Sequence, residues 1–254
     1  LEKLSTFISK RCVKRNPSLL EVGSNDGSLL KILKKRDFGQ LYGVDPAKNI
    51  VDSINEPEII FYTDFFDYNF TISFTESNGN VDIVVARNVF SHVPDLVSCL
   101  KGVANLLVED GLFIMEFHEA TKILTEIHYD SIYHEHTFYH SIKSISEAAK
   151  IAGLNPFDIE VSPISGGSFI LFFSKTFKEK TINLIEHEIS ENNSGVLTFQ
   201  KWKEFAERSL KNLEDIREYL SKNTYRRVCG FGASARSSTL VNAIGSGCQN
   251  IIGI

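Results

Sequence analysis

The residues best suited to chemistry are concentrated in one short stretch, Tyr133-His134-Glu135-His136. Five of the seven histidines of the chain lie between His118 and His140, around this stretch. A phenol, a carboxylate and two imidazoles so close together can accept, donate or hold protons near neutral pH, and core packing does not need that mixture. The alternative is a polar loop whose histidines have no functional role. The motifs in the rest of the chain must decide between these two interpretations.

A glycine-containing loop lies early in the chain, where a first strand is expected to turn into a first helix. It reads Glu21-Val22-Gly23-Ser24-Asn25-Asp26-Gly27. Gly23 and Gly27 let the backbone approach a ligand or take positive φ angles. Glu21 and Asp26 would repel a diphosphate, so a cationic or zwitterionic ligand such as S-adenosylmethionine (SAM) fits better. The alternative is a tight turn followed by a helix-capping aspartate.

Three further positions follow expected strands, and ligands of such sheets bind beyond the carboxyl ends of the strands. Asp45 can accept hydrogen bonds from both hydroxyls of a ribose. In Asp64-Phe65-Phe66, the carboxylate and an aromatic ring could bind adenine, although a loop with core phenylalanines explains the pattern nearly as well. His92 would lie on the active face, unless it is merely exposed beside a helix that begins at Pro94-Asp95.

Strand and helix patterns alternate through the first half of the chain, which predicts the α/β class with a doubly wound, mostly parallel sheet. Strands are expected at 18–22, 40–44, 59–62, 81–86 and 111–117, and helices at 1–15, 28–35, 47–54, 95–107 and 120–127. The histidine stretch falls in a loop before an expected helix at 141–152. Two strands, 157–161 and 168–173, are expected to form a hairpin at the sheet edge.

The last third of the chain reads differently. Residues 179–222 are polar and helical, with a break at 192–195. A strand at 227–231, a glycine turn, a helix at 234–244 and a strand at 250–254 then suggest a new unit. Gly230-x-Gly232-x-x-Ala235 satisfies the dinucleotide fingerprint, which predicts a second, smaller Rossmann-like unit.

Composition excludes several classes of protein. The chain has 254 residues, 43% of them hydrophobic, a net charge of -5 and a pI of about 5.8. Without a basic patch, nucleic acid is not expected as a partner, and no apolar run reaches membrane-spanning length. Four scattered cysteines are typical of reduced thiols in a cytoplasmic protein. The chain begins at Leu1 and stops in what reads as a strand, which suggests a fragment.

The order of the motifs resembles one family. E-x-G-S-N-D-G, V-D-P, D-F-F, A-R-N-V-x-x-H-x-P-D and Y-H-E-H look like the class I SAM-dependent sugar C-methyltransferases, nearest to the C-3′-methyltransferases of nucleotide-linked 4-keto deoxysugars. The resemblance spans residues 18–245 and includes Gly166-Gly167-Ser168 and Gly230-Phe231-Gly232-Ala233-Ser234-Ala235-Arg236. Each glycine motif is weakly specific, whereas their ordered combination with Y-H-E-H is strong.

The resemblance implies a SAM-dependent methyl transfer to a carbon beside a ketone, in which a base forms an enolate. By similarity His136 is the base, Glu135 and Tyr133 lie close to the sugar, and His92 supports the enolate or the proton transfer. Residues expected at the substrate are Gly167, Ser168, Gly232 and Arg236. Residues expected at SAM are Glu21, Gly23, Asn25, Asp26, Gly27, Asp45, Pro46, Asp64, Phe65, Arg87 and Asn88.

This interpretation divides the chain and makes one structural demand. Residues 1–176 would bind SAM and carry a catalytic loop at 129–140, 177–222 would be a helical connector, and 223–254 would begin a truncated substrate-binding unit that holds a nucleotide-linked sugar. In a strand, Tyr133 and Glu135 would face away from His136. All three can converge only if the segment is an irregular loop.

Three departures from the family pattern bear on the ligands. The family usually begins with a cysteine-ligated zinc domain, and no such pattern precedes residue 18. Ile170 stands where the family tends to carry arginine, and Arg236 where lysine is common. Within this chain no metal site is expected, because His134 and His136 lack the i, i+4 spacing of zinc hydrolases. Nothing in the residues fixes an oligomeric state.

Three other functions remain open. A SAM methyltransferase with an oxygen or nitrogen acceptor would not need a carbon-acid base. An NAD-dependent oxidoreductase could be built on the Gly230 loop. A non-catalytic binding protein for sugar nucleotides would hold the sugar without transferring a methyl group.

Overall fold

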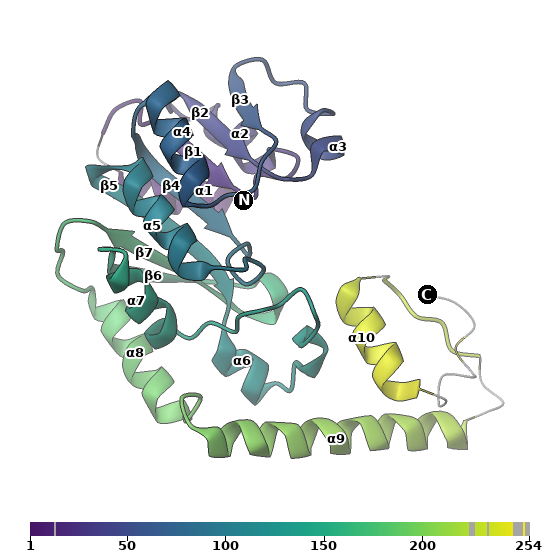
Figure 1. Ribbon diagram of the computed structural model, residues 1–254. Helices are drawn as coiled ribbons and strands as arrows, with labels where there is room; N and C mark the ends of the chain where they lie inside the picture. Colours follow the sequence, from purple (N-terminus) through teal and green to yellow (C-terminus); the bar gives the residue numbers. More distant parts are fainter. Residues whose placement is uncertain (13, 224–226, 233, 246–250, 252–254) are drawn as a thin grey trace.

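The computed structural model describes residues 1–12, 14–223, 227–232, 234–245 and 251, and one seven-stranded sheet organises most of them (Figure 1). The strand order is β3-β2-β1-β4-β5-β7-β6. The first five are parallel, while β7 pairs antiparallel with both β5 and β6. The strands are β1 (Leu19–Val22), β2 (Leu41–Val44), β3 (Ile59–Tyr62), β4 (Val81–Arg87), β5 (Leu107–His118), β6 (Asn155–Ser162) and β7 (Ser168–Ser174).

Helices cover both faces of the sheet, as the doubly wound prediction requires. On one face pack α4 (Tyr68–Asn78), α5 (Leu96–Leu106) and α7 (Ile142–Ile151), whose apolar side chains join one core with alternate strand residues. The other face is covered by α1 (Glu2–Arg11) and α2 (Ser28–Leu33), which form a second core. The parallel strands are buried on both faces, so their sequences read as apolar runs.

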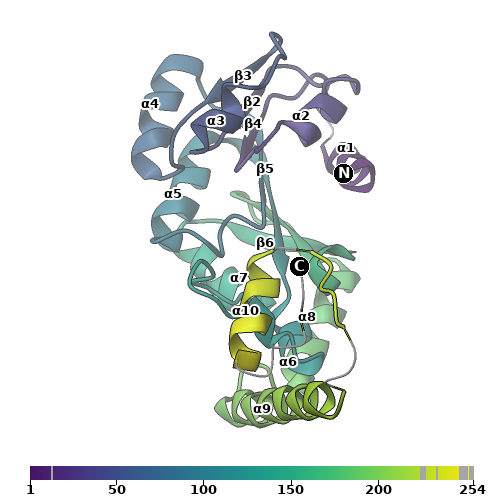
Figure 2. The same ribbon diagram turned by 90° about the vertical axis from the view of Figure 1, so that its right-hand side faces the viewer.

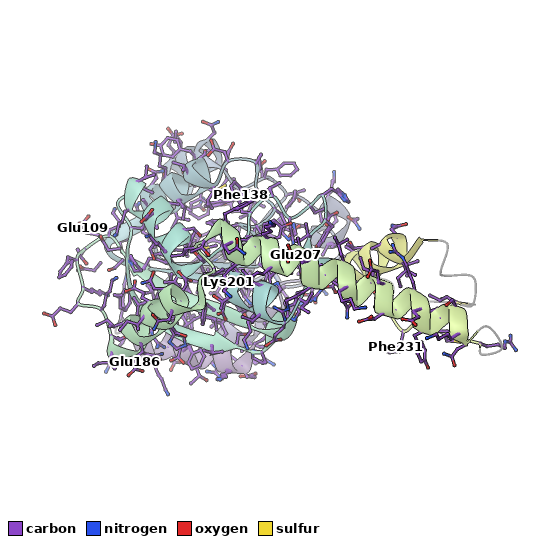
Figure 3. The ribbon with its side chains drawn as sticks, turned by 90° about the horizontal axis from the view of Figure 1, so that it is seen from below. Glu109, Phe138, Glu186, Lys201, Glu207 and Phe231 are labelled. Atoms are coloured by element: carbon purple, nitrogen blue, oxygen red, sulfur yellow. The ribbon has the colours of Figure 1, made fainter. Side chains whose placement is uncertain are left out.

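Two of the remaining elements lie beside the sheet: α3 (Lys48–Val51) follows β2, and α8 (Ile182–Ser194) packs against β6 and α7. The others lie beyond one end of the sheet and are α6 (Ala120–Thr125), η1 (Tyr129–Ser131), η2 (Ile164–Gly166), α9 (Phe199–Lys222) and α10 (Ala235–Ile244). Figures 1 and 2 both show α9 beneath α6 and α10. Seen from below in Figure 3, α9 runs from Lys201 under the sheet towards Phe231, beyond the main body. None of the described helices is long and apolar enough to cross a membrane.

The fold class is confirmed, and the differences from prediction are local. Helix α4 was not expected, because its stretch of phenylalanine, threonine and serine has no clear apolar stripe; the Asp67 side chain starts it by accepting from the Phe70 amide. Strand β5 begins at Leu107, four residues before the expected start. The predicted hairpin forms, with β6 at the sheet edge.

The C-terminal unit is described in part. Helix α10 matches the expected helix, and Val228 forms a parallel bridge with Ile251. The other residues of the strand expected at 250–254 lie outside the described residues. Within the described part of 227–231, that single bridge is the only strand-like pairing.

Candidate active site

The stretch Tyr133-His134-Glu135-His136 lies in an irregular loop, as the convergence of its side chains demands. Residues 132–140 form neither helix nor strand, and a turn is closed by the His136 amide, which donates to the Tyr133 carbonyl at 3.0 Å. The loop follows α6 and η1 at the carboxyl end of β5. The turn brings the Tyr133 and His136 side chains to the same side.

His136 is oriented from both of its ring nitrogens. Its Nδ1 lies 2.7 Å from the Ser131 carbonyl, and its Nε2 lies 3.1 Å from the Tyr133 hydroxyl. A carbonyl can only accept, so Nδ1 carries the hydrogen and Nε2 presents a lone pair in the neutral ring. Burial lowers the pKa of His136, and the Ser131 bond partly offsets that shift. The ring is therefore neutral at physiological pH and able to take up a proton.

His92 reaches the same place from the loop after β4. Its ring centroid lies 4.8 Å from that of His136, and its Nδ1 is 3.0 Å from the Glu135 carbonyl. By the same argument Nδ1 of His92 donates, which leaves Nε2 as an acceptor. Two imidazoles from distant parts of the sequence thus lie side by side.

Backbone contacts fasten the two loops to each other. The Thr137 amide donates to the Ser91 carbonyl at 2.8 Å, and the Thr137 hydroxyl lies within reach of the Ser91 and Val93 carbonyls. The Phe138 amide also donates to Ser91. These bonds hold His92 and His136 in register without any regular secondary structure.

The other two members of the motif face solvent. The Glu135 side chain is 58% exposed and its carboxylate lies 4.0 Å from Nε2 of His134, which is 88% exposed. Glu135 therefore serves the described site through its carbonyl, which binds His92. A role for its carboxylate at a substrate stays a prediction.

A cavity of about 60 Å³ lies beside His136. Its walls come from the ends of β4 and β5, from the loop, and from the C-terminal unit. The lining residues are Asn88, Ser91, His118, Ile123, Ser131, His136, Phe138, Tyr139, Ser165 and Arg236. The cavity is thus closed by segments up to 148 positions apart in sequence, from Asn88 to Arg236.

At the carboxyl end of β1, Glu21 is 3% exposed and its Oε2 has no hydrogen-bond partner among the described residues. Burial raises the pKa of this carboxyl to about 8, against the opposing effect of the nearby Arg87 guanidinium. A buried carboxylate oxygen without a partner is costly, so it is well suited to a ligand that brings a positive charge.

The loop after β1 is shaped by Asp45 and by unusual backbone angles. The Asn25 amide donates to Asp45 Oδ2 and the Ala47 amide to Asp45 Oδ1, both at 2.9 Å. Asn25 itself has a φ of 48°. Asp45 thereby joins the loops after β1 and β2, with its carboxylate held at the sheet edge. Asp26 accepts from the Ser28 amide, and hydrogen bonding by the Ser28 side chain, followed by that of its amide, lowers the pKa of Asp26.

Gly23 and Gly27 both need to be glycine. Their φ angles are 65° and 71°, in the left-handed region. A Cβ at Gly23 would overlap Val89 Cγ2, and one at Gly27 would lie 2.8 Å from Phe61 Cζ. The loop is therefore a close backbone cradle beside the unpartnered Glu21 oxygen. This combination suits a ligand with a positive charge beside Glu21, and the roles predicted for Glu21 and Asp45 at SAM stay predictions.

The remaining residues predicted at SAM lie on neighbouring strand ends. Phe65 is 74% exposed, Phe66 is buried in the core, and Asp64 accepts from the Phe65 amide. Pro46 is exposed after β2. Of this trio, Phe65 is the ring that an adenine could reach.

Arg87 and Asn88 link the cofactor end to the cavity. Arg87 Nε donates to Glu116 Oε2 at 2.9 Å, and Glu116 is buried. Asn88 has a φ of 53°, its amide donates to the Glu116 carbonyl, and its side chain lines the cavity. Asn88 thus stands between the two halves of the site.

The four residues predicted at the substrate differ in their position relative to the cavity. Ser168 is fully buried and its hydroxyl donates to the Ile164 carbonyl, and a Cβ at Gly167 would meet Lys122. Gly232 is exposed and has a φ of 103°. Only Arg236 lines the cavity, where its guanidinium forms a two-bond pair with Asp130 at 2.8 and 2.9 Å.

Sequence reasoning missed four residues that the site uses. Ser131 orients His136, Asp130 holds Arg236, and His118 and His128 form a pair at 3.2 Å beside the cavity. The clustering of histidines contained a signal for the last two. No sequence pattern could have indicated Ser131, because it acts through its carbonyl. The described residues contain no group of three or more potential metal ligands, so no metal site is identified there.

Comparison with known families and proteins gives consistent results. Residues 1–158 match the family described as "Methyltransferase domain", and residues 163–252 match "C-methyltransferase C-terminal domain". The chain is 29% identical over 237 residues to the C-methyltransferase NovU of Streptomyces niveus. That alignment covers 92% of this chain and 56% of NovU, so the chain spans about half the length of this relative.

Solved structures resemble the chain in fold. Magnesium protoporphyrin IX methyltransferase from Synechocystis PCC 6803, with SAM bound, has a TM-score of 0.51 and 14% identity over 69% of this chain and 77% of that one. The same enzyme with S-adenosylhomocysteine bound has a TM-score of 0.53 and 15% identity, covering 69% and 81%. At these identities the likeness shows the Rossmann-like methyltransferase fold.

Proposed function

The chain belongs to the SAM-dependent methyltransferases, since the family of methyltransferase domains matches more than half of it, and on this premise we propose that it methylates a carbon. The acceptor would be the carbon beside the ketone of a nucleotide-linked keto-deoxysugar. The observation that carries this proposal is the His136 imidazole, held by the Ser131 carbonyl with a lone pair on Nε2.

Carbon acceptors need such a base and heteroatom acceptors need it less. A carbon–hydrogen bond beside a ketone is weakly acidic, so a positioned base of suitable pKa is required to break it. His136 accepts that proton on Nε2, while the electron pair of the bond moves to the ketone oxygen. Its lowered pKa keeps the ring unprotonated at neutral pH, and the Ser131 carbonyl fixes which nitrogen reacts.

Tyr133 and His92 complete the proton chemistry. Burial raises the pKa of Tyr133, so its hydroxyl keeps its proton and can donate. In the free protein it donates to Nε2 of His136; with substrate bound it turns to the ketone oxygen and stabilises the enolate, which frees Nε2. His92 supports the proton transfer from 4.8 Å away.

SAM would be held at the other end of the site and supply the electrophilic methyl group. Glu21 would accept from its ammonium, Asp45 from its ribose, and Phe65 would pack on its adenine. The loop from Gly23 to Gly27 would follow its backbone closely, because no Cβ intervenes. Asn88, which lies between Arg87 and the cavity, would separate the cofactor from the acceptor.

The sugar nucleotide is supported by the C-terminal match and by the relative NovU, a C-methyltransferase. Arg236 brings a guanidinium from α10 to the cavity wall, where it could contact a sugar or a phosphate. By the motif resemblance, the nucleotide would lie on the C-terminal unit. Gly167, Ser168 and Gly232 would then shape the pocket through their backbone.

Incubation with labelled SAM and a panel of nucleotide 4-keto sugars tests the proposal directly. We expect label on a carbon beside the ketone, located by NMR of the product. In the absence of SAM, the same carbon should exchange its hydrogen for deuterium from solvent. Label on oxygen or nitrogen, or preferential binding of NADH over SAM in calorimetry, would refute the proposal.

A further inference from the structure

A second pair of histidines, His118 and His128, lies beside the same cavity and has no part in the chemistry above. His118 ends β5 and lines the cavity together with His136. Its Nε2 lies 3.2 Å from Nδ1 of His128, and the two rings stack with centroids 5.4 Å apart. Nε2 of His128 in turn lies 3.3 Å from Glu126 Oε2. Three side chains therefore form a line from the cavity outwards.

The outer end of this line opens to water. The Glu126 side chain is 45% exposed, and its other oxygen binds Lys122 at 2.8 Å. Lys122 lowers the pKa of Glu126, so the carboxylate is ionised at neutral pH. His128, in the middle, is 15% exposed. The line thus connects the cavity with solvent through two rings.

The ionised Glu126 determines which nitrogen of each ring carries the hydrogen. Facing a carboxylate, Nε2 of His128 must donate, which leaves its Nδ1 as an acceptor. His118 must then donate from Nε2 to that acceptor, so its own Nδ1 is free of hydrogen. Burial lowers the pKa of His118 to about 4, with smaller contributions from His128, Arg236 and His136. His118 is therefore neutral and can pass a proton on without storing it.

Glycine makes room for this pair. A Cβ at Gly166 would lie 2.9 Å from Cε1 of His128, and Gly166 has a φ of 85°. The backbone of His118 pairs with that of the buried Ser168 between β5 and β7. In this structure the Gly166-Gly167-Ser168 motif packs against the histidine pair.

We propose that His118 and His128 form a proton relay that carries the proton abstracted by His136 out of the cavity to Glu126 and solvent. The inference rests on the proposed function, because the base that removes the carbon-bound proton must lose that proton again before the next turnover. The protonated His136 transfers its proton towards Nδ1 of His118 across the cavity. His118 releases the hydrogen of Nε2 to Nδ1 of His128, and His128 releases its own to Glu126. One proton leaves, and each ring ends with the number of hydrogens it had but carries its hydrogen on Nδ1. Rotation of the two rings, or exchange of their hydrogens with solvent, then restores the hydrogens on Nε2 before the next turnover.

The tautomers test the geometry without any substrate. Nitrogen-15 NMR of histidine-labelled protein should find the hydrogen on Nε2 in both His118 and His128, but on Nδ1 in His136. H118Q and H128N identify the signals. A hydrogen on Nδ1 of His118 would overturn the relay, because no acceptor would then face the cavity.

Exchange kinetics test the transfer itself. With the keto sugar that the wild type methylates, H128N and H118N should slow both steady-state methylation and solvent deuterium exchange by about tenfold or more. The first turnover, measured by rapid quench, should change by less than about twofold, because His136 can take up one proton without the relay. His187→Asn is the matched control, since its ring binds the Asn183 carbonyl on α8, outside the cavity lining.

Rescue separates a relay from a structural role. Added imidazole, a small proton carrier, should restore exchange in H128N in proportion to its concentration. The relay would be overturned if the rate of the first turnover fell as much as the steady-state rate, or if both variants kept the wild-type rate of exchange. Either result would leave the proposed function standing. If the wild type methylates nothing in the panel, the proposed function itself fails.

Discussion

The proposed cofactor end and the proposed catalytic loop are built in opposite ways. Glu21, Asp45 and Arg87 stand at the ends of buried parallel strands, whose register sets their positions. Tyr133 and His136 stand in an irregular loop, held by backbone carbonyls and by the neighbouring loop at Ser91. A parallel sheet brings its strand ends to one edge wherever the pattern is followed. The loop depends on a few individual contacts, so its residues should respond differently to substitution.

The largest expected effect lies in the loop. His136→Asn should lower kcat by about 10² to 10⁴, because it removes a general base from a reaction that cannot proceed without one. SAM affinity, measured by calorimetry, should stay within about twofold, since the cofactor end is separate. His134→Asn, at an exposed position of the same loop, is the control and should keep nearly full activity. Appreciable turnover by His136→Asn would favour an oxygen or nitrogen acceptor.

For Glu21→Gln we expect the main effect on SAM affinity, whereas His136→Asn should mainly lower kcat. SAM affinity should fall by about 10- to 100-fold, because a hydrogen bond to a charged group contributes about 1.5–3 kcal/mol. At pH 7 the wild type should also release a proton on binding SAM, since its Glu21 has a pKa of about 8 without ligand. Calorimetry in buffers of different ionisation enthalpy measures that release, which the variant should lack.

Glu21→Gln should also change how the stability of the protein depends on pH. Folding raises the pKa of Glu21 from 4.5 to about 8, so the folded protein holds this proton more tightly than the unfolded one. The resulting stability is present below pH 4.5 and is lost as pH rises towards 8. Glu21→Gln, without SAM, should therefore gain stability relative to the wild type across that interval. An equal melting temperature difference at pH 5 and pH 8 would contradict this account.

Gly23→Ala tests the rigidity of the cradle. The left-handed φ and the overlap with Val89 should together cost about 2 kcal/mol of unfolding free energy, measured by urea denaturation. Val89→Ala in the same chain should recover only the part due to overlap. Gly153→Ala is a useful control, because its φ of 77° is also positive and nothing lies within 4 Å of an added Cβ. A loss at Gly23 no greater than at Gly153 would remove the case for close packing there.

The smallest effect is expected where the C-terminal unit meets the loop. Arg236 pairs with Asp130, next to the Ser131 carbonyl that orients His136. R236K and D130N should each cost less than about 1 kcal/mol of stability, since both side chains are about a third exposed. If the pair acts as a unit, the double variant should lower kcat no more than either single one. Additive losses would assign the two side chains separate roles, such as phosphate binding by Arg236.

Much of the fold followed from local patterns. Alternating apolar strands and helices predicted the sheet and its two covered faces, and Gly23 and Gly27 predicted the turn after β1. Helix α4 was not predicted, because its aromatic and hydroxyl side chains leave no clear helical periodicity in the sequence. It is stabilised by packing on α5 and by Asp67. The residues predicted at SAM could be named from sequence because they follow the ends of strands, and their contact with SAM stays a prediction.

The composition of Tyr133-His134-Glu135-His136 indicated proton chemistry, and its order did not decide which groups meet. That depended on tertiary contacts: Ser131 turns Nε2 of His136 towards Tyr133, and Ser91 brings His92 alongside. His118 and His128 are ten positions apart in sequence and become partners only where β5, β7 and η2 converge. Sequence periodicity encodes which face of a regular element is buried. The orientation of a ring in an irregular loop is set by hydrogen bonds to carbonyls, which every residue carries and no side-chain pattern records.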